Sequence, residues 1–351
     1  MATIILTGGG SAGHCTPHLA ILPYLKNNFD KIYYVGSENG IEKDIISHTD
    51  IPYYSVSCQK LKRNFSMKNF LIPLNVYKGI RQAVKIIDKL QPDVIFSKGG
   101  YVSVPLVLAA KKRKIPIVSH ESDYTPGLAN KLISKYCTRV LTSFPETAKQ
   151  FKNGLYVGAP IRSGLSAPKK KAYEMFGFSG TKPVLLITGG SQGAQSINKV
   201  VRQSLDELLK KYDIIHICGK NNLDESIDKK GYYQTEYMHK IENAFAIASV
   251  CVSRAGSNAL FELLSLKIPC VLIPLPKGAS RGDQVLNAEY FQKQGLASVL
   301  PQNALTKDSL IFNVNAVYCN KTNLNKNFTK YPVADKSRQI SRLIADQVKH
   351  N

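Results

Sequence analysis

The sequence predicts an α/β protein with two parallel β-sheets, and two observations support this prediction. First, short apolar runs alternate with longer stretches in which apolar residues recur at helical spacing. This pattern is typical of βαβ units, whose strands are buried on both faces. Second, residues 4–13 and 185–194 are near-duplicates, each an apolar run that enters a glycine-rich turn. Each half of the chain is therefore expected to form one Rossmann-like domain.

The strands are predicted from apolar runs along the whole chain. They are Thr3–Leu6, Lys31–Val35, Val94–Phe96, Ile115–Ser119, Val140–Thr142, Val184–Thr188, Ile214–Cys218, Val250–Val252 and Cys270–Pro274. A break at Gly158–Arg162, followed by a polar stretch, divides the chain into predicted domains 1–161 and 162–334. Ligands of such sheets bind beyond the carboxyl ends of the strands, so a cleft between two facing domains is the expected site.

Composition excludes several classes of protein. The chain has 351 residues, of which 44% are apolar and 21% charged, as in ordinary folded proteins. Its longest mostly apolar run, Val102–Ala110, is far shorter than the roughly 20 residues of a membrane span. The N-terminus lacks the basic segment of a signal peptide. Seven scattered cysteines without a C-x-x-C pair argue against disulfides and zinc, and we expect a cytosolic protein.

The formal charge of +22 indicates which partners the protein could bind, and it does not indicate the fold. Nucleic acid, an anionic membrane face and phosphorylated substrates all fit a basic protein. The lysines are not interleaved with aromatic residues along one stripe, so no nucleic-acid partner is expected.

Three polar or glycine-rich segments follow predicted strands in the first half. Gly8–Gly13 satisfies G-x-G-x-x-G, a turn whose backbone can approach a diphosphate at a helix N-terminus. His14 is expected to begin that helix and to project into the cleft. Gly99-Gly100-Tyr101 forms a second such turn, and His120–Asp123 places four polar side chains at a strand end.

The second half repeats this arrangement. Gly189–Gly193 is a third glycine-rich turn, and Ser253–Glu262 is a strand-to-helix turn that offers a helix N-terminus and a carboxylate. Gln284 and Asn287 lie about one helical turn apart, and amides suit ligands rich in hydroxyl groups. These segments together indicate a site for a nucleoside diphosphate joined to a polyhydroxylated group.

Two missing motifs limit the chemistry. No G-x-x-x-x-G-K-[ST] is present, which excludes a P-loop enzyme, and no Asp-x-Asp pair is present that would chelate a metal beneath a sugar nucleotide. Helix dipoles and cationic side chains would then stabilise the leaving group, without metal or other cofactor. An NAD-binding oxidoreductase that uses Gly8–Gly13 and Glu38 is a further hypothesis. It gives no function to the second nucleotide loop or to the Gln284/Asn287 pair.

The motifs in this order and spacing resemble the MurG family of UDP-N-acetylglucosamine transferases. The matching segments are Thr7–Ala20, Gly99–Ala110, His120–Asn130, Gly158–Arg162, Gly189–Asn198, Ser253–Glu262 and Gly282–Ala288. The resemblance implies a GT-B fold, with a C-terminal helix near 335–351 returning to the first domain. It implies an inverting, metal-independent transfer from UDP-GlcNAc to undecaprenyl-diphospho-muramoyl-pentapeptide in peptidoglycan synthesis. Another UDP-sugar enzyme, with a different acceptor or an epimerase activity, is the alternative.

The resemblance also implies the site residues. In the family, Glu262 takes the ribose hydroxyls and Met238 lies beside the uracil. The acceptor diphosphate would lie against Gly10, Gly99, Gly100 and Tyr101. The donor would contact Ser11, Ala12, Gly13, Asp123, Arg162, Ser191, Met238, Ser257, Asn258, Ala259, Glu262, Gln284 and Asn287.

Two positions depart from the family pattern. The first loop reads Gly-Gly-Ser-Ala-Gly-His instead of Gly-Gly-Thr-Gly-Gly-His, and Asp123 replaces an asparagine that contacts the sugar in many members. Asp123 retains an acceptor at that position but lacks the amide donor.

His14 is the predicted catalytic base, because it is the one imidazole within a glycine loop facing the cleft and its pKa would lie near neutrality. The acceptor's lipid tail further implies peripheral binding to the cytoplasmic side of the cell membrane. The predicted membrane face is basic and apolar and comprises Phe70, Leu71, Leu74, Lys111, Lys112 and Arg113.

Overall fold

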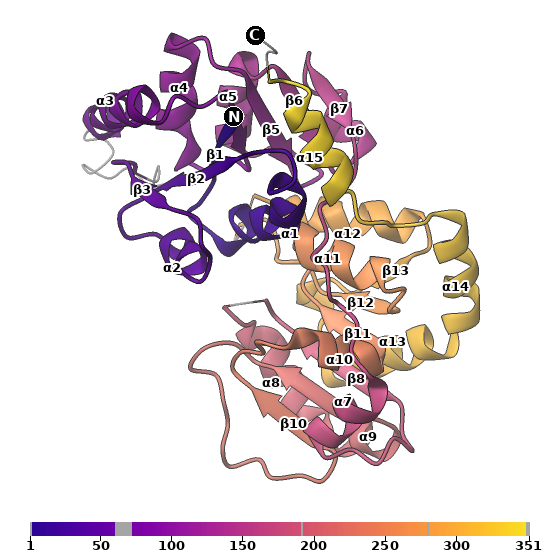
Figure 1. Cartoon of the computed structure of the whole chain (residues 1–351). Coiled ribbons are helices and arrows are strands. Elements are labelled where there is room, and N and C mark those ends of the chain that lie inside the picture. Colours follow the sequence, from indigo (N-terminus) through magenta and orange to yellow (C-terminus); the bar gives the residue numbers. More distant parts are fainter. Residues whose placement is uncertain (1, 60–71, 191, 279–280, 349–351) are drawn as a thin grey trace. The chain divides into compact units, whose positions relative to one another are not determined.

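The computed structural model describes residues 2–59, 72–190, 192–278 and 281–348. The chain divides into two compact units (Figure 1). Unit 1 consists of Met1–Arg162 together with Asp335–Asn351, and unit 2 consists of Ser163–Ala334. Within the described residues, no helix is both long and apolar enough to cross a membrane.

Unit 1 is built on a seven-stranded parallel sheet in the order β3-β2-β1-β4-β5-β6-β7. Its strands are β1 (Thr3–Thr7), β2 (Lys31–Gly36), β3 (Tyr53–Ser55), β4 (Val94–Ser97), β5 (Ile117–Glu121), β6 (Arg139–Thr142) and β7 (Gly154–Tyr156). Its helices are α1 (Thr16–Leu25), α2 (Ile41–Ser47), α3 (Ile72–Leu90), α4 (Ser103–Lys112), α5 (Leu128–Ile133), α6 (Pro145–Ala148) and α15 (Ser337–Ala345), with short 3₁₀ turns η1 (Ala12–His14) and η3 (Ser134–Tyr136).

The sheet of unit 1 separates two hydrophobic cores. Successive side chains of a strand point to opposite faces, so Ile4 and Leu6 of β1 join one core while Ile5 joins the other. The first core is completed by α1 and α15, and the second by α3 and α4. Because both faces are covered, the central strands contain continuous apolar runs such as Ile4–Leu6 and Val94–Phe96.

Helix α15 belongs to unit 1, although all of unit 2 precedes it in the sequence (Figure 1). Ile340 and Ile344 are fully buried in the same core as residues of α1. The Asp335 carboxylate accepts hydrogen bonds from the Ile161 and Ser337 backbone N–H groups, at 2.8 and 2.9 Å. The start of this returning segment is therefore fastened to the end of the first segment.

Unit 2 contains a six-stranded parallel sheet in the order β10-β9-β8-β11-β12-β13. Its strands are β8 (Val184–Thr188), β9 (Asp213–Ile217), β10 (Tyr232–Thr235), β11 (Ala248–Ser253), β12 (Cys270–Leu272) and β13 (Ala297–Val299). Its helices are α7 (Lys169–Phe176), α8 (Gln195–Gln203), α9 (Leu205–Lys211), α10 (Ile241–Ile247), α11 (Ser257–Ser265), α12 (Asp283–Lys293), α13 (Lys307–Cys319) and α14 (Lys321–Lys330), with a 3₁₀ turn η4 (Gln302–Ala304).

The predicted α/β class with two parallel sheets is confirmed. Each of the predicted apolar runs overlaps a strand. The run predicted at Ile115–Ser119 is displaced, since β5 occupies Ile117–Glu121 and the Ile115 N–H still bonds the Ala110 carbonyl at the end of α4. Strands β3, β7, β10 and β13 are not among the predicted runs.

Candidate active site

The glycine-rich loops lie at the position in each sheet where strand order changes direction. In unit 1, β1 and β4 are neighbours, and the chain builds the sheet outward from them in opposite directions. In unit 2, β8 and β11 occupy the equivalent position. Such topological switch points are where open α/β sheets bind ligands. The predicted turns therefore form two pairs. The turn after β1 neighbours the turn after β4, and the turn after β8 neighbours the turn after β11.

The two loops of unit 1 are in close contact, and glycine is required there. Gly10 has φ +82°, and a Cβ on it would lie 2.4 Å from the Tyr101 ring. A Cβ on Gly100 would lie 2.2 Å from the Gly9 carbonyl oxygen. The predicted loops thus form one surface at the carboxyl edge of the sheet.

A buried carboxylate that the sequence patterns did not indicate fastens the first loop. Glu42, in the first turn of α2, is fully buried. It accepts hydrogen bonds from Gly10 N–H at 3.1 Å, from Ser37 N–H at 3.0 Å and from the Ser37 hydroxyl. Its position after Gly40, at the start of a helix, is the sequence signal that could have indicated this role.

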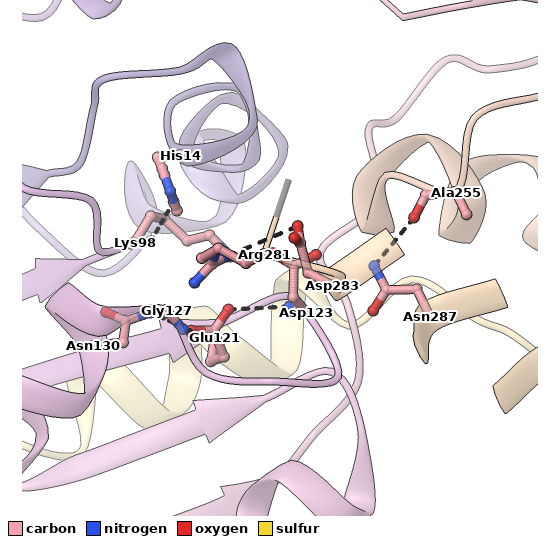
Figure 2. Close-up of polar contacts among 10 residues, drawn as sticks. All are labelled: His14, Lys98, Glu121, Asp123, Gly127, Asn130, Ala255, Arg281, Asp283 and Asn287. Carbon is pink, nitrogen blue, oxygen red and sulfur yellow. Dashed lines mark hydrogen bonds and ion pairs between the residues drawn. The ribbon is translucent and has the colours of Figure 1, made fainter. Parts of the chain in front are cut away.

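His14 lies in the 3₁₀ turn η1, and not at the start of a helix as predicted, because α1 begins at Thr16. The ring is half-buried, and Nδ1 lies 3.0 Å from the Lys98 carbonyl oxygen (Figure 2). A carbonyl oxygen only accepts, so Nδ1 donates and Nε2 carries the lone pair of the neutral ring. Burial lowers the pKa of His14, Lys98 lowers it further, and Glu121 and Asp123 partly oppose this shift.

Lys98 is a second residue that the sequence patterns did not indicate. It directly follows β4 and is only 1% exposed. Its Nζ donates to the Ser122 hydroxyl at 2.7 Å and to His120 Nδ1 at 2.6 Å. Burial lowers the pKa of Lys98 to about 7, against the opposing charges of Glu121 and Asp123. A lysine soon after the apolar run Val94–Phe96 was the sequence signal that could have indicated this role.

The predicted polar segment after β5 is held by Glu121. This buried carboxylate accepts from Asp123 N–H at 3.0 Å, Gly127 N–H at 2.9 Å and Asn130 Nδ2 at 2.8 Å (Figure 2). Both carboxylate oxygens are therefore engaged in shaping the loop. Asp123 is half-buried and lies close enough to His14 and Lys98 to affect their pKa values.

In unit 2, two glycines of the loops face open space. Gly190, which follows β8, and Gly256, which precedes α11, would each have no heavy atom within 4 Å of an added Cβ. Gly190 has φ +82°, whereas Gly256 has φ −68°, which any residue can adopt. The turn Ser253–Glu262 has the predicted form, because β11 ends at Ser253 and α11 begins at Ser257.

The remaining predicted donor residues differ in exposure. Met238 and Ser257 are buried, Asn258, Ala259 and Glu262 are half-buried, and Arg162 is exposed. Gln284 accepts a hydrogen bond from Leu275 N–H at 3.0 Å, and fully buried Asn287 donates to the Ala255 carbonyl at 3.1 Å (Figure 2). Both amides therefore hold loops of unit 2. Ser191 lies outside the described residues.

Arg254 connects three segments of unit 2 and was not predicted individually. Its guanidinium donates to the Ile273 carbonyl at 3.0 Å and to the Ser196 hydroxyl, near the start of α8, at 3.2 Å. Burial lowers the pKa of Arg254. The turn after β11 thus contains a half-buried cation.

The predicted membrane face is only partly described. Phe70 and Leu71 lie outside the described residues, whereas Leu74 on α3 is 65% exposed. Lys111, Lys112 and Arg113 are exposed at the end of α4. Arg113 forms a two-pronged ion pair with Asp88, at 2.6 and 2.7 Å, and Lys111 Nζ lies 4.3 Å from the Tyr136 ring centre.

Two Rossmann-like units, each with paired loops at its switch point, define the GT-B class of glycosyltransferase folds. Residues 4–142 match the glycosyltransferase family 28 N-terminal domain, and residues 184–347 match the family 28 C-terminal domain. The chain belongs to glycosyltransferase family 28. The protein is therefore a glycosyltransferase, and the hypothesis of an NAD-binding oxidoreductase is rejected.

Curated relatives are similar over nearly the whole chain. A Bacillus thuringiensis (strain Al Hakam) protein is 50% identical over 94% of this chain and 96% of its own length. A Clostridium botulinum (strain Langeland) protein is 47% identical over 99% of this chain and 100% of its own. Both are named UDP-N-acetylglucosamine--N-acetylmuramyl-(pentapeptide) pyrophosphoryl-undecaprenol N-acetylglucosamine transferase.

Solved structures share the fold. MurG of Acinetobacter baumannii has a TM-score of 0.77 at 21% identity, covering 99% of this chain and 100% of the other. A UDP-GlcNAc 2-epimerase from Neisseria meningitidis has a TM-score of 0.65 at 13% identity, covering 99% of each chain. At these identities the likeness concerns the fold alone, and it includes enzymes of different activity.

Proposed function

We propose that the protein transfers N-acetylglucosamine from UDP-N-acetylglucosamine to the 4-hydroxyl of undecaprenyl-diphospho-N-acetylmuramoyl-pentapeptide. The observation that carries this proposal is the near-full-length identity of about one half to relatives named for that reaction. The arrangement of loops supports it, since each unit has a glycine-rich surface at a ligand-binding edge.

Unit 2 has the features needed to bind the donor. The dipole at the start of α11 favours a diphosphate, and Gly256 leaves space for one. Glu262 lies on the same helix and would accept hydrogen bonds from both ribose hydroxyls. Ser257, Asn258 and Ala259, at the start of α11, would contact the diphosphate. Arg254 lies in the turn between β11 and α11 and adds positive charge.

Unit 1 has the features needed for the acceptor and the base. The surface formed by Gly10, Gly99, Gly100 and Tyr101 would hold the acceptor diphosphate, and Ser11, Ala12, Gly13 and Asp123 would adjoin the sugar being transferred. His14 Nε2 would take the proton of the muramyl 4-hydroxyl. That oxygen then attacks the anomeric carbon from the side opposite UDP, the carbon–oxygen bond to UDP breaks, and UDP leaves as the anion.

The acceptor's lipid tail requires a membrane-facing surface. We assign this role to the α3–α4 surface, which comprises the exposed residues Leu74, Tyr77, Lys111 and Lys112. Leu74 and Tyr77 are 65% and 59% exposed, whereas Ile80 of the same helix packs against the core. The two apolar side chains lie near the start of α3 and the two lysines at the end of α4. A surface that combines exposed apolar and basic residues suits the cytoplasmic leaflet, whose anionic lipids attract basic residues.

The proposal is tested by a transfer assay with radiolabelled UDP-N-acetylglucosamine and a lipid-linked muramyl-pentapeptide acceptor. We expect a disaccharide product with the inverted anomeric configuration and full activity in EDTA. Release of free or epimerised sugar without transfer would contradict the proposal and favour an epimerase. Loss of activity in EDTA would contradict the metal-free account.

A further inference from the structure

Three loops of unit 1 meet at Lys98. Its backbone carbonyl accepts the hydrogen bond of His14, from the loop after β1. Its ammonium group holds His120 and Ser122, at the end of β5 and in the loop after it. Lys98 also lies close to Gly8, because a Cβ there would be 3.1 Å from Lys98 Cβ. This single residue therefore joins the loops that follow β1, β4 and β5.

The ammonium group is held by neutral partners whose orientation is fixed. His120 Nε2 lies 3.0 Å from the Gly158 carbonyl oxygen and must donate to it. The other ring nitrogen, Nδ1, is then an acceptor and receives the Lys98 ammonium at 2.6 Å. Because a buried ion is costly without full hydrogen bonding, a lysine here needs a role that an apolar residue would not fill.

Charge gives Lys98 a direct effect on the His14 ring. The ionisable groups that act on His14 are Lys98 from the loop after β4, and Glu121 and Asp123 from the loop after β5; His18 of α1 also interacts with it. The two carboxylates favour the protonated ring, and Lys98 opposes them. Without the lysine, the two carboxylates would act on the base, and among the described residues no other positive charge offsets them there.

We propose that Lys98 is a positioning residue for the transfer reaction, whose ammonium group holds the Ser122–Asp123 segment beside His14 and offsets the charge of Asp123. This inference rests on the proposed function. The neutral form of His14 is the form that can accept a proton, and the charge of Lys98 favours it. The negative charge of the Asp123 carboxylate, which favours the protonated ring, makes this offset necessary.

The test compares the pH dependence of kcat for the parent protein, Lys98→Met and Lys98→Met/Asp123→Asn, with a water-soluble acceptor. Lys98→Met should move the acidic limb of the profile upward by about one pH unit and thereby lower kcat on that limb, below about pH 6, by up to roughly tenfold. Adding Asp123→Asn should move that limb back toward the parent position. UDP binding measured by calorimetry should stay unchanged in both variants.

The matched control is Lys43→Met, which removes an exposed lysine of α2 in the same unit and should leave the profile unchanged. An unaltered kcat and acidic limb in folded Lys98→Met would overturn the inference. If that variant does not fold by circular dichroism, Ser122→Ala removes one hydrogen bond of the ammonium and should lower kcat without raising KM for the donor. An unchanged kcat in Ser122→Ala would then overturn it. Absence of transfer by the parent protein would instead reject the proposed function.

Discussion

Replacing His14 with alanine is expected to lower kcat by about 10²–10⁴, the usual cost of losing a general base. The Nδ1 hydrogen bond to Lys98 fixes the ring, so alanine removes an oriented base. Steady-state kinetics with a water-soluble acceptor measure the effect, and UDP binding serves as the control for folding. Activity within a few-fold of the parent would move the role to Asp123, because Glu121 already accepts three hydrogen bonds.

Replacing Glu262 with alanine should reduce kcat/KM for the donor by roughly one to two decades. The lost interaction is a charge-assisted pair of hydrogen bonds to the ribose, worth about 1.5–3 kcal/mol. Titration calorimetry with UDP provides an independent measurement. Unchanged UDP affinity would remove Glu262 from the donor site.

At the residue scale, sequence patterns identified the glycines of the loops and missed the buried charged residues that hold the loops in place. Glycine-rich turns after apolar strands are a local signal, and it indicated Gly10 and Gly100. Glu42 and Lys98 function through partners distant in the sequence, since Glu42 contacts Gly10 and Lys98 contacts His120. No periodicity marks such residues, because only the sheet topology brings their partners together.

At the scale of single elements, the start of α11 makes the donor site testable. Gly256→Ala should fold normally, because φ is −68° and an added Cβ has no neighbour within 4 Å. The alanine should even raise the free energy of unfolding by about 0.4–1 kcal/mol, because it reduces the conformational entropy of the unfolded chain. If a diphosphate approaches this backbone, the donor KM should rise about tenfold. An unchanged KM would exclude close approach of the diphosphate to Gly256.

The α3–α4 surface predicts salt-sensitive binding to anionic vesicles. Lys111→Glu/Lys112→Glu should weaken binding at low salt by at least about tenfold, since each basic residue contributes roughly 1 kcal/mol. Arg113 is left unchanged because it pairs with Asp88. The control reverses Lys169 and Lys170, exposed lysines of α7 in unit 2. Equal binding by the variant and the parent would place the membrane face elsewhere.

The strands show where prediction by apolar runs succeeds and fails. The central strands were found because they are buried on both faces. All four missed strands, β3, β7, β10 and β13, are edge strands of their sheets. Their residues are largely half-buried or exposed, as in Tyr232–Thr235, so their sequences do not form apolar runs. An apolar run in the sequence therefore indicates that a strand is buried on both faces, and it does not mark strands in general.

At the scale of the whole molecule, each unit contains a buried neutral histidine that resists protonation. Burial lowers the pKa of His18 in unit 1 and of His216 in unit 2 to about 3, with Lys98 and Arg202 as further causes. The unfolded chain takes up these protons near pH 6.5. The contribution of the two neutral histidines to the free energy of unfolding is therefore fully present above that pH and is lost as the pH falls toward 3.

Thermal unfolding should therefore show a midpoint that decreases between pH 6.5 and pH 4. The control is His48→Gln, an exposed histidine whose removal should leave this decrease unchanged. A midpoint that stays constant over this range would contradict the prediction. The measurement is differential scanning calorimetry in buffers of equal ionic strength.

Helix α15 has a consequence for the order in which the newly made chain can fold. Synthesis proceeds from the N-terminus, and domains generally fold as units while this continues. All residues of unit 2 have been made by Ala334, whereas Ile21 and Leu25 share their core with Ile340 and Ile344. The first part of the protein must therefore wait until α15 has been translated, and a premature stop codon before α15 would damage the domain synthesised first.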